Sequence, residues 1–283
     1  MAPNAQEVIE MQRSDWNKVA GGWDKWDWKL NERLGFLNQL LVGFAQLRNG
    51  QRVLDLGSGT GYPALLAAQI VGPEGKVLGV DLAENMLEVS RRRAKEQKLA
   101  NVEFRAADVT DLQEEAGSYD AAISRFCLMF LPEISKALSS IAHILKPNGI
   151  LATAVWSSPE KNPHISLPMG VLRDMGVVPP PDPSQPGIFR LAKPGDLAQM
   201  AQAVGLQTIV DMEIDTDFAW DSIDEYFESL LEIAAPIQTA FGKLSPAQQK
   251  QAEAEIKQRG KKLQRASRFV LPSAVRLVAA RKS

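Results

Sequence analysis

The residues of this chain with the clearest chemical potential are three glycines on alternate positions, Gly57, Gly59 and Gly61. They follow the apolar run 52–56 and precede an apolar, helix-like segment, 62–71. Glycine has no Cβ and tolerates positive φ, so such a turn lets the backbone come very close to a ligand. The free N–H groups and the positive dipole end of the following helix would face that ligand. This pattern predicts a seat for a nucleotide-like cofactor that carries a negative group, and a structural turn without a ligand is the alternative.

Two carboxylates lie at positions that strengthen this interpretation. Asp55 is inside the run 52–56, where a purely structural buried strand would favour Val or Ile. Asp81 closes the apolar run 76–80, where its side chain could accept hydrogen bonds from a ribose diol. The alternative role of Asp81 is to cap the helix that follows it.

The elements that must position these residues alternate between strands and helices. Strands are predicted at 52–56, 76–80, 102–106, 119–124 and 149–156, and helices at 62–71, 83–98 and 132–145. This alternation implies parallel βαβ units with right-handed crossovers, which bind ligands beyond the carboxyl ends of the strands. Four polar residues fall at or just beyond such ends: Asp55, Asp81, Asp108 and Ser124.

The remaining segments are expected to flank this core. Helices are predicted at 5–20 and 30–47 before it, and a Pro-rich loop with one short helix at 157–192 after it. The rest of the chain is expected to form a helix (194–204), a strand (206–218), two helices (221–235 and 245–265) and a last strand (271–280). The basic run 91–93 is expected on a solvated helix face.

The spacing of the glycines distinguishes between two cofactor classes. A dinucleotide site of the form G-x-G-x-x-G would need glycine where Tyr62 stands. The chain instead resembles the class I S-adenosylmethionine (SAM)-dependent methyltransferases, in five segments that follow the order of that family: 53–62, 80–82, 107–109, 119–124 and 145–151. Within the class it is most similar to the group of small-molecule enzymes that includes the ubiquinone and menaquinone C-methyltransferases and the type 11 enzymes.

This resemblance implies an α/β fold with a doubly wound, seven-stranded, mostly parallel sheet. The implied strand order is 3-2-1-4-5-7-6, with the last strand antiparallel. Residues 1–50 would form an N-terminal helical lid, and residues 51–283 the SAM-binding domain. The segments 157–192 and 221–266 would be cap insertions over the mouth of the site.

The resemblance also implies contacts for the cofactor. The methionine part would pack on the turn formed by Gly57, Ser58, Gly59 and Gly61. Asp55 would lie beside that turn and order a water molecule or the amino group of the cofactor.

The nucleoside end is implied to lie farther along the sheet. Asp81 would take the ribose hydroxyls, and Leu82 would pack near the adenine. Asp108 would accept from the adenine amino group, with Val109 beside the ring, although Asp108 could instead cap the loop that follows it. Met86 would cover the adenine, or it belongs to the apolar face of its own helix.

The methyl end of the cofactor is implied to face Ser124 and Arg125. Arg125 would pair with an anionic group of cofactor or substrate, or form a surface salt bridge. The spacing Trp16…Ala20…Trp23 matches a segment of the family that carries an aromatic residue, so Trp23 is expected to close the site over the sulfonium.

His164, in the first cap segment, is the candidate general base. An ordinary exposed loop histidine is the alternative.

The composition narrows the function further. A net charge of −2 argues against a nucleic-acid substrate, and the single cysteine, Cys127, excludes an internal disulfide and a cluster of thiolate metal ligands. The start of the chain has no signal-peptide pattern, so a cytoplasmic protein is expected. The predicted function is methyl transfer from SAM, with S-adenosylhomocysteine as product, to a small, hydrophobic or aromatic acceptor. A non-catalytic SAM or nucleotide sensor and a nicotinamide-dependent oxidoreductase are the alternatives.

Overall fold

A single mixed sheet organises the molecule. The computed structural model describes residues 4–182, 185–265 and 268–283. The seven strands lie in the order β3-β2-β1-β4-β5-β7-β6, and β7 pairs antiparallel with both β5 and β6. The other pairings are parallel. Strand order and direction therefore confirm the fold that the sequence predicted.

The helices and strands follow each other closely along the chain. The strands are β1 (Arg52–Leu56), β2 (Lys76–Asp81), β3 (Val102–Ala106), β4 (Tyr119–Arg125), β5 (Leu145–Trp156), β6 (Leu206–Trp220) and β7 (Phe269–Lys282). The helices up to β5 are α1 (Ala5–Lys25), α2 (Asp27–Phe44), α3 (Ala64–Val71), α4 (Glu84–Glu96) and α5 (Ile134–Ile144). The later helices are α6 (Pro163–Asp174), α7 (Asp196–Ala203), α8 (Ile223–Ile233), α9 (Ala235–Phe241) and α10 (Pro246–Leu263). Short 3-10 turns, η1 (Val109–Asp111), η2 (Leu128–Phe130) and η3 (Pro159–Lys161), complete the described elements.

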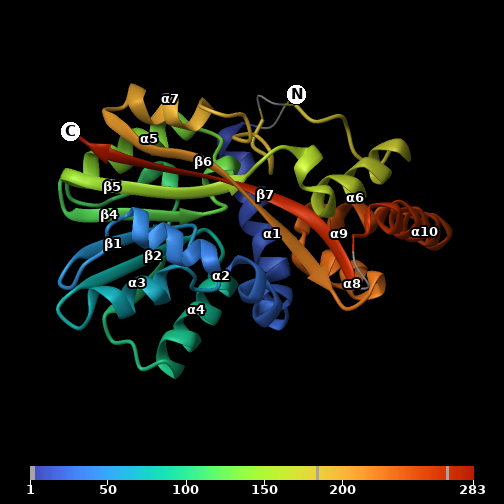
Figure 1. Ribbon diagram of the computed structural model, residues 1–283, viewed down its shortest axis with the longest axis horizontal. Helices are drawn as coiled ribbons and strands as arrows, with labels where there is room; N and C mark the ends of the chain where they lie inside the picture. Colours follow the sequence, from blue (N-terminus) through green and yellow to red (C-terminus); the bar gives the residue numbers. More distant parts are fainter. Residues whose placement is uncertain (1–3, 183–184, 266–267) are drawn as a thin grey trace.

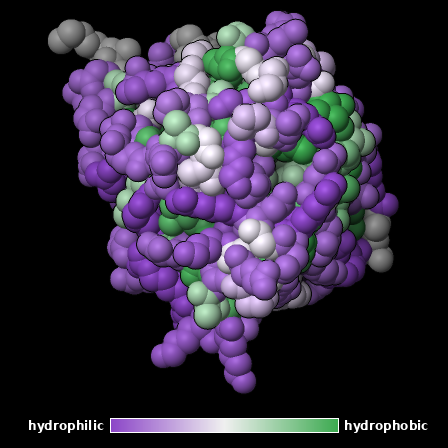
Figure 2. Space-filling model, turned by 90° about the vertical axis from the view of Figure 1, so that its left-hand side faces the viewer, coloured by the Kyte–Doolittle hydropathy of each residue, from purple (hydrophilic) through white to green (hydrophobic). Residues whose placement is uncertain are grey.

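Both faces of the sheet are covered by helices, as the hydrophobic strands require. In Figure 1, α2, α3 and α4 lie on one side of the sheet, and α5 and α7 lie on the other. Successive residues of β4 point to opposite faces of the sheet. Ile123 packs in the cluster with Leu41 of α2, and Ala122 packs in the cluster with Leu138 of α5. Figure 2 shows the face at the amino ends of the parallel strands, which is mostly hydrophilic.

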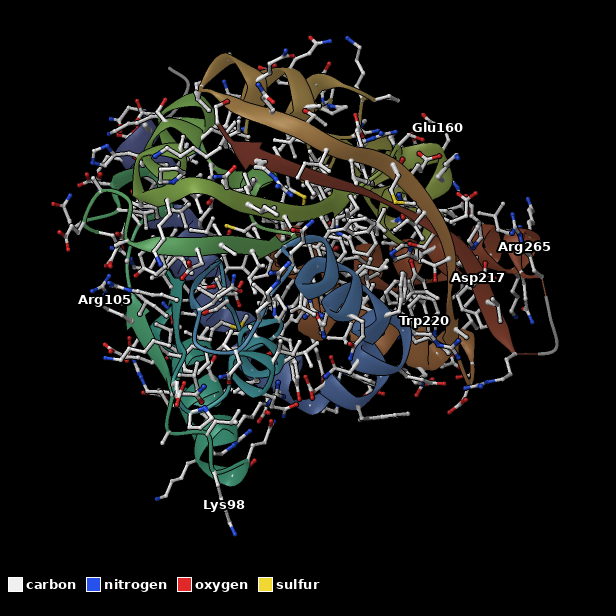
Figure 3. The ribbon with its side chains drawn as sticks, turned by 60° about the vertical axis from the view of Figure 1, so that its left-hand side comes forward. Lys98, Arg105, Glu160, Asp217, Trp220 and Arg265 are labelled. Atoms are coloured by element: carbon white, nitrogen blue, oxygen red, sulfur yellow. The ribbon has the colours of Figure 1, made fainter. Side chains whose placement is uncertain are left out.

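A cap stands beyond the other end of the sheet. It consists of α6, α8, α9 and α10 around the far ends of β6 and β7, which run past the other strands (Figure 1). The pairing of β6 with β7 continues to Trp220 and Phe269, which is farther than the predicted strand ends at 218 and 271. Figure 3 shows Trp220 inside the cap and Asp217 near Arg265 at its outer side. All four helices begin within the segments 157–192 and 221–266 that were expected as insertions.

Helix α1 continues to Lys25, although the sequence predicted its end at residue 20. The helix continues through Gly21 and Gly22, and the lack of a side chain at Gly22 allows α1 to pack closely on α8. A Cβ on Gly22 would lie 2.1 Å from the carbonyl oxygen of Glu232 at the end of α8, whereas a Cβ on Gly21 would meet no atom within 4 Å.

Ion pairs hold α1 between α8 and α4. Lys25 pairs with Glu228 and Glu232 at 2.8 and 2.9 Å. On the opposite side, Arg92 and Arg93 of α4 pair with Asp24 at 2.6 and 3.0 Å. Arg93 is buried and also donates to the carbonyl of Thr60 in the glycine turn. The expectation of a solvated basic run is therefore wrong for Arg93, which joins the lid helix to the turn.

The contact at Gly22 gives a matched pair of variants. We expect Gly22→Ala to lose about 1–3 kcal/mol of unfolding free energy, because the new methyl group must push α1 away from α8. Gly21→Ala is expected to gain up to about 1 kcal/mol, because alanine favours the helix and this position is open. Urea denaturation of both variants checks the prediction, and an equal effect of the two substitutions would contradict it.

Candidate active site

The glycine turn after β1 has the open backbone that a close ligand needs. Gly57, Gly59 and Gly61 all have positive φ, at +69°, +51° and +109°. The N–H groups of Gly57 and Ser58 both donate to the carbonyl of Val80, which ties the turn to β2. A Cβ on Gly59 would meet no atom within 4 Å, whereas a Cβ on Gly57 would lie 2.4 Å from the Cβ of Cys127. The open side of the turn is therefore at Gly59.

The carboxylate of Asp81 is fixed against this turn. One oxygen accepts from the N–H of Gly59 and the other from the N–H of Ala83, both at 2.9 Å. Burial raises the pKa of Asp81, and the bonds from Ala83 and Gly59 oppose that shift. Each carboxylate oxygen can accept more than one bond, so Asp81 serves the turn and keeps capacity for a ribose diol. The helix-capping alternative and the ribose role are thus compatible.

The three predicted carboxylates all influence the same thiol. Burial raises the pKa of Cys127, and the charges of Asp81, Asp55 and Asp108 add to that shift. One oxygen of Asp108 accepts from the N–H of Thr110 at 2.8 Å, which is the loop-capping role that the sequence left open. Leu82 is half-buried beside Asp81.

Two of the proposed adenine contacts belong to the packed interior. Val109 is buried in the core that includes Leu56 and Val80. Met86 is buried against Val19 and Ala20 of α1. The structure thus gives Met86 the apolar helix-face role, on the side where α4 meets α1.

Asp55 lies in β1, two residues before the first glycine of the turn. Its side chain is fully buried, and one oxygen accepts from the N–H of Ala64 at the start of α3, at 3.0 Å. The other oxygen has no partner among the described residues. Burial raises the pKa of Asp55 to about 7, opposed by the bond from Ala64 and the charge of Arg125. The carboxylate therefore holds the helix that follows the turn, which is an indirect contribution to the cofactor seat.

The end of β4 brings Ser124 and Arg125 next to the turn. The hydroxyl of Ser124 is buried and donates to the carbonyl of Leu56 at 3.0 Å. The guanidinium of Arg125 donates to Oδ1 of Asn38 in α2 at 2.9 Å. Burial lowers the pKa of Arg125 to about 10, so it stays charged at neutral pH. No ion pair of Arg125 is found among the described residues, and its side chain is only partly exposed, which disagrees with the surface salt-bridge alternative.

Aromatic residues of α1 close one side of this region. The Trp16 ring makes edge contacts with Trp23 and with Phe130 of η2, at centroid distances of 6.1 and 5.5 Å. The indole N–H of Trp23 donates to the carbonyl of Ile233 at 3.0 Å, and Gln12 donates to the carbonyl of Phe130 at 2.7 Å. Helix α1 thus connects η2, after β4, with the cap.

His164 is not an exposed loop residue. It lies in the first turn of α6 with 7% of its surface exposed. Burial lowers its pKa to about 3, so the imidazole is neutral at physiological pH and a weak proton acceptor. The structure therefore argues against the predicted role of general base.

Two features of the site were missed by sequence reasoning. Phe126 has a left-handed backbone, with φ of 61°, directly after β4. Its ring stacks on Trp156 at the end of β5, with the centroids 4.2 Å apart and the planes 6° from parallel. Non-glycine residues with positive φ are sparse and gather at functional sites. No local sequence signal marks this conformation, because phenylalanine has no preference for it.

The raised pKa of Asp55 predicts a dependence of stability on pH. Asp55 has a higher pKa in the folded chain than its unfolded value of 3.8. The unfolding free energy of the protein therefore falls as the pH rises from about 4 to 7. Asp55→Asn keeps an acceptor for the N–H of Ala64 and removes the titration, so the stability of the variant relative to the natural chain should rise over this range. Urea denaturation at pH 5, 6 and 7 checks this, with the exposed Glu88→Gln as control. A constant difference across pH would contradict it.

The open space beside Gly59 predicts an effect of substitution on SAM binding. We expect Gly59→Ala to weaken binding of SAM by at least tenfold, because its methyl group would occupy the open side of the turn. The loss of unfolding free energy should be limited to about 1–2 kcal/mol, the cost of a left-handed non-glycine residue. Calorimetric titration and urea denaturation measure the two effects, and unchanged SAM affinity would remove Gly59 from the seat.

Comparison with known proteins agrees with this geometry. Residues 47–167 match the model of a methyltransferase domain family. A demethylmenaquinone methyltransferase of Lactococcus lactis is 32% identical over 159 residues, which are 54% of this chain and 59% of that protein. The match therefore spans less than two thirds of this relative.

Solved structures resemble almost the whole chain. The cyclase SpnF has a TM-score of 0.59 at 21% identity, covering 100% of this chain and 97% of that one. A phosphoethanolamine N-methyltransferase of Haemonchus contortus, in complex with S-adenosylhomocysteine, has a TM-score of 0.59 at 20% identity, covering 99% of this chain and 61% of that one. These likenesses show the fold. Residues 47–167 are therefore similar to a methyltransferase domain, within a chain that has the fold of solved methyltransferases.

Proposed function

We propose that the protein transfers a methyl group from SAM to a small, hydrophobic or aromatic acceptor by in-line displacement. The observation that carries this proposal is the Asp81 carboxylate, which is fixed against the open glycine turn by the N–H of Gly59. When bound, SAM supplies a methyl group that is already activated on a sulfonium. The residues of the chain then have to align the two reactants and exclude water.

The cofactor contacts remain proposals that follow the geometry of the seat. Gly57, Ser58, Gly59 and Gly61 would hold the methionine part, and Asp81 the ribose. Asp108, with one oxygen engaged by Thr110, keeps the other for the adenine amino group. Ser124 and Asp55 would act indirectly, because their side chains fix β1 and α3 in place.

The methyl end is proposed to lie between Arg125 and the aromatic residues of α1. Among the described residues, Arg125 bonds Asn38 through Nη1, so its remaining donors suit the carboxylate of the cofactor or an anionic group of the acceptor. Trp23 would face the sulfonium, for which an aromatic ring offers cation–π attraction. The apolar character of Phe126, Phe130 and Trp156 supports a hydrophobic or aromatic acceptor.

Other features fit the same proposal without deciding it. In the part of the chain that the structure describes, no helix has the length and apolar character to cross a bilayer. We propose a small-molecule acceptor and no nucleic acid, because the net charge is −2. We also propose the cytoplasm as the location of the protein.

Titration of the purified protein with SAM, S-adenosylhomocysteine and NADH tests the cofactor. We expect micromolar binding of the first two and none of NADH. An acceptor screen of quinones, phenols and amines, measured by formation of S-adenosylhomocysteine, then tests transfer. SAM binding without turnover of any acceptor would favour a SAM sensor instead.

Asp81→Ala tests the residue that carries the proposal. We expect SAM binding to weaken by about 1–3 kcal/mol, because hydrogen bonds to a charged acceptor are lost. Glu88→Ala, which removes an exposed carboxylate of α4, is the matched control and should bind as the natural chain does. Circular dichroism establishes that both variants fold. If a folded Asp81→Ala variant bound SAM as tightly as the natural chain does, the proposed ribose contact would be wrong.

A further inference from the structure

A column of aromatic rings leads from the glycine turn into the cap. It begins at the stacked pair of Phe126 and Trp156 and continues through His164 to Phe218. Trp156 meets the edge of the His164 ring at 5.3 Å, and His164 stacks on Phe218 at 4.6 Å and 22°. The order of these contacts places an imidazole inside an otherwise apolar wall.

The near end of this column belongs to the cofactor seat. Phe126 is the neighbour of Cys127, whose Cβ occupies the space beside Gly57. The left-handed backbone of Phe126 is held by a bond from its N–H to the carbonyl of Ala154 at 2.8 Å. Its ring is partly exposed. The partly exposed ring of Phe126 is therefore the end of the column that a flat acceptor could contact.

The imidazole of His164 is a polar group without a partner. Its Nδ1 and Nε2 are both buried and bond to nothing among the described residues. The lowered pKa keeps the ring neutral, and the carbonyl of Pro272 opposes this shift without reaching hydrogen-bond geometry. An unsatisfied buried polar group costs about 1–3 kcal/mol, so its presence needs an explanation.

Several polar groups near His164 do have partners. Tyr226 donates to the backbone carbonyl of His164 at 2.9 Å, so this turn of α6 is fixed. The indole of Trp220 donates to Ser229 at 3.0 Å. Asn162 donates to the carbonyl of Ala274 at 2.9 Å and accepts from its N–H at 3.0 Å. The imidazole is therefore one of few buried polar groups of the described cap without a partner, together with Nε of Arg173 in α6.

We infer that the imidazole of His164 receives the hydroxyl or carbonyl oxygen of an aromatic acceptor whose ring lies along Phe126 and Trp156. A neutral imidazole offers one donor and one acceptor, which matches a phenolic hydroxyl and suits an uncharged ring. Because Trp156 and Phe218 cover the imidazole, the wall side chains must shift when the acceptor enters. This inference deepens the proposed function and rests on it. His164 acts here as a specificity-determining contact.

Two probes that differ in one hydroxyl test the inference. With S-adenosylhomocysteine bound, 4-methylphenol and toluene are titrated into the protein. We expect 4-methylphenol to bind roughly 2- to 12-fold more tightly, the worth of one hydrogen bond. His164→Phe keeps an aromatic ring and should abolish this preference, whereas His143→Phe, at an exposed position of α5, should keep it. Equal affinity of the natural chain for both probes, or no binding of either, would overturn the inference.

The natural chain gives a second readout that needs no variant. It has two histidines, so long-range proton–nitrogen spectra of ¹⁵N-histidine-labelled protein resolve each ring. The nitrogen shifts of His164 should move with 4-methylphenol and those of His143 should not. Equal movement of both rings, or of neither, would contradict the assigned contact.

Stability separates this role from a purely structural one. Removal of an unpartnered imidazole should leave the melting temperature of His164→Phe unchanged or raise it. A marked fall would show that the ring nitrogens hold the cap together, and would overturn the inference. Failure of the natural chain to bind S-adenosylhomocysteine would count against the proposed function, whereas its binding with equal probe affinities would count against the His164 contact alone.

Discussion

The hydrogen bond between the Asp81 carboxylate and the N–H of Gly59 fixes the relation on which the site depends. It joins the end of β2 to the turn after β1, at the edge where parallel strands present their loops. Because Asp81 also holds Ala83, the same carboxylate sets the start of α4. From α4, Arg93 reaches the turn and the lid helix. One carboxylate thus aligns the glycine turn with the start of α4 and, through Arg93, with α1.

The lid helix is anchored at more points than its position at the chain start would suggest. Helix α1 contacts α4 through Asn17 and Asp24, η2 through Gln12, and α8 through Gly22 and Lys25. Exposed ion pairs contribute little each. The close approach at Gly22 and the buried Arg93 give the helix a defined seat. This polar helix of 21 residues therefore has a fixed position against α4, η2 and α8.

The fold was readable from the sequence because its signals are local. Alternating strands and helices and the glycine turn lie within short windows, and strand order followed from the resemblance. Side-chain roles depended on tertiary neighbours. The N–H of Ala64 as partner of Asp55, the burial of Arg93 and the enclosure of His164 each involve a different element. Residues 21–22 show the same limit, since the reason for Gly22 lies in α8.

The pairing of β6 with β7 has a mechanical consequence. These two strands stay paired from the sheet into the cap, from Leu206 and Lys282 to Trp220 and Phe269, with one register shift between Thr208 and Val210. A pair of hydrogen-bonded strands resists bending far more than a loop does, so the cap is held rigidly to the sheet. Rotation of the cap as a rigid lid would require breaking that pairing. Passage to and from the interior therefore falls to rotation of side chains in the aromatic wall.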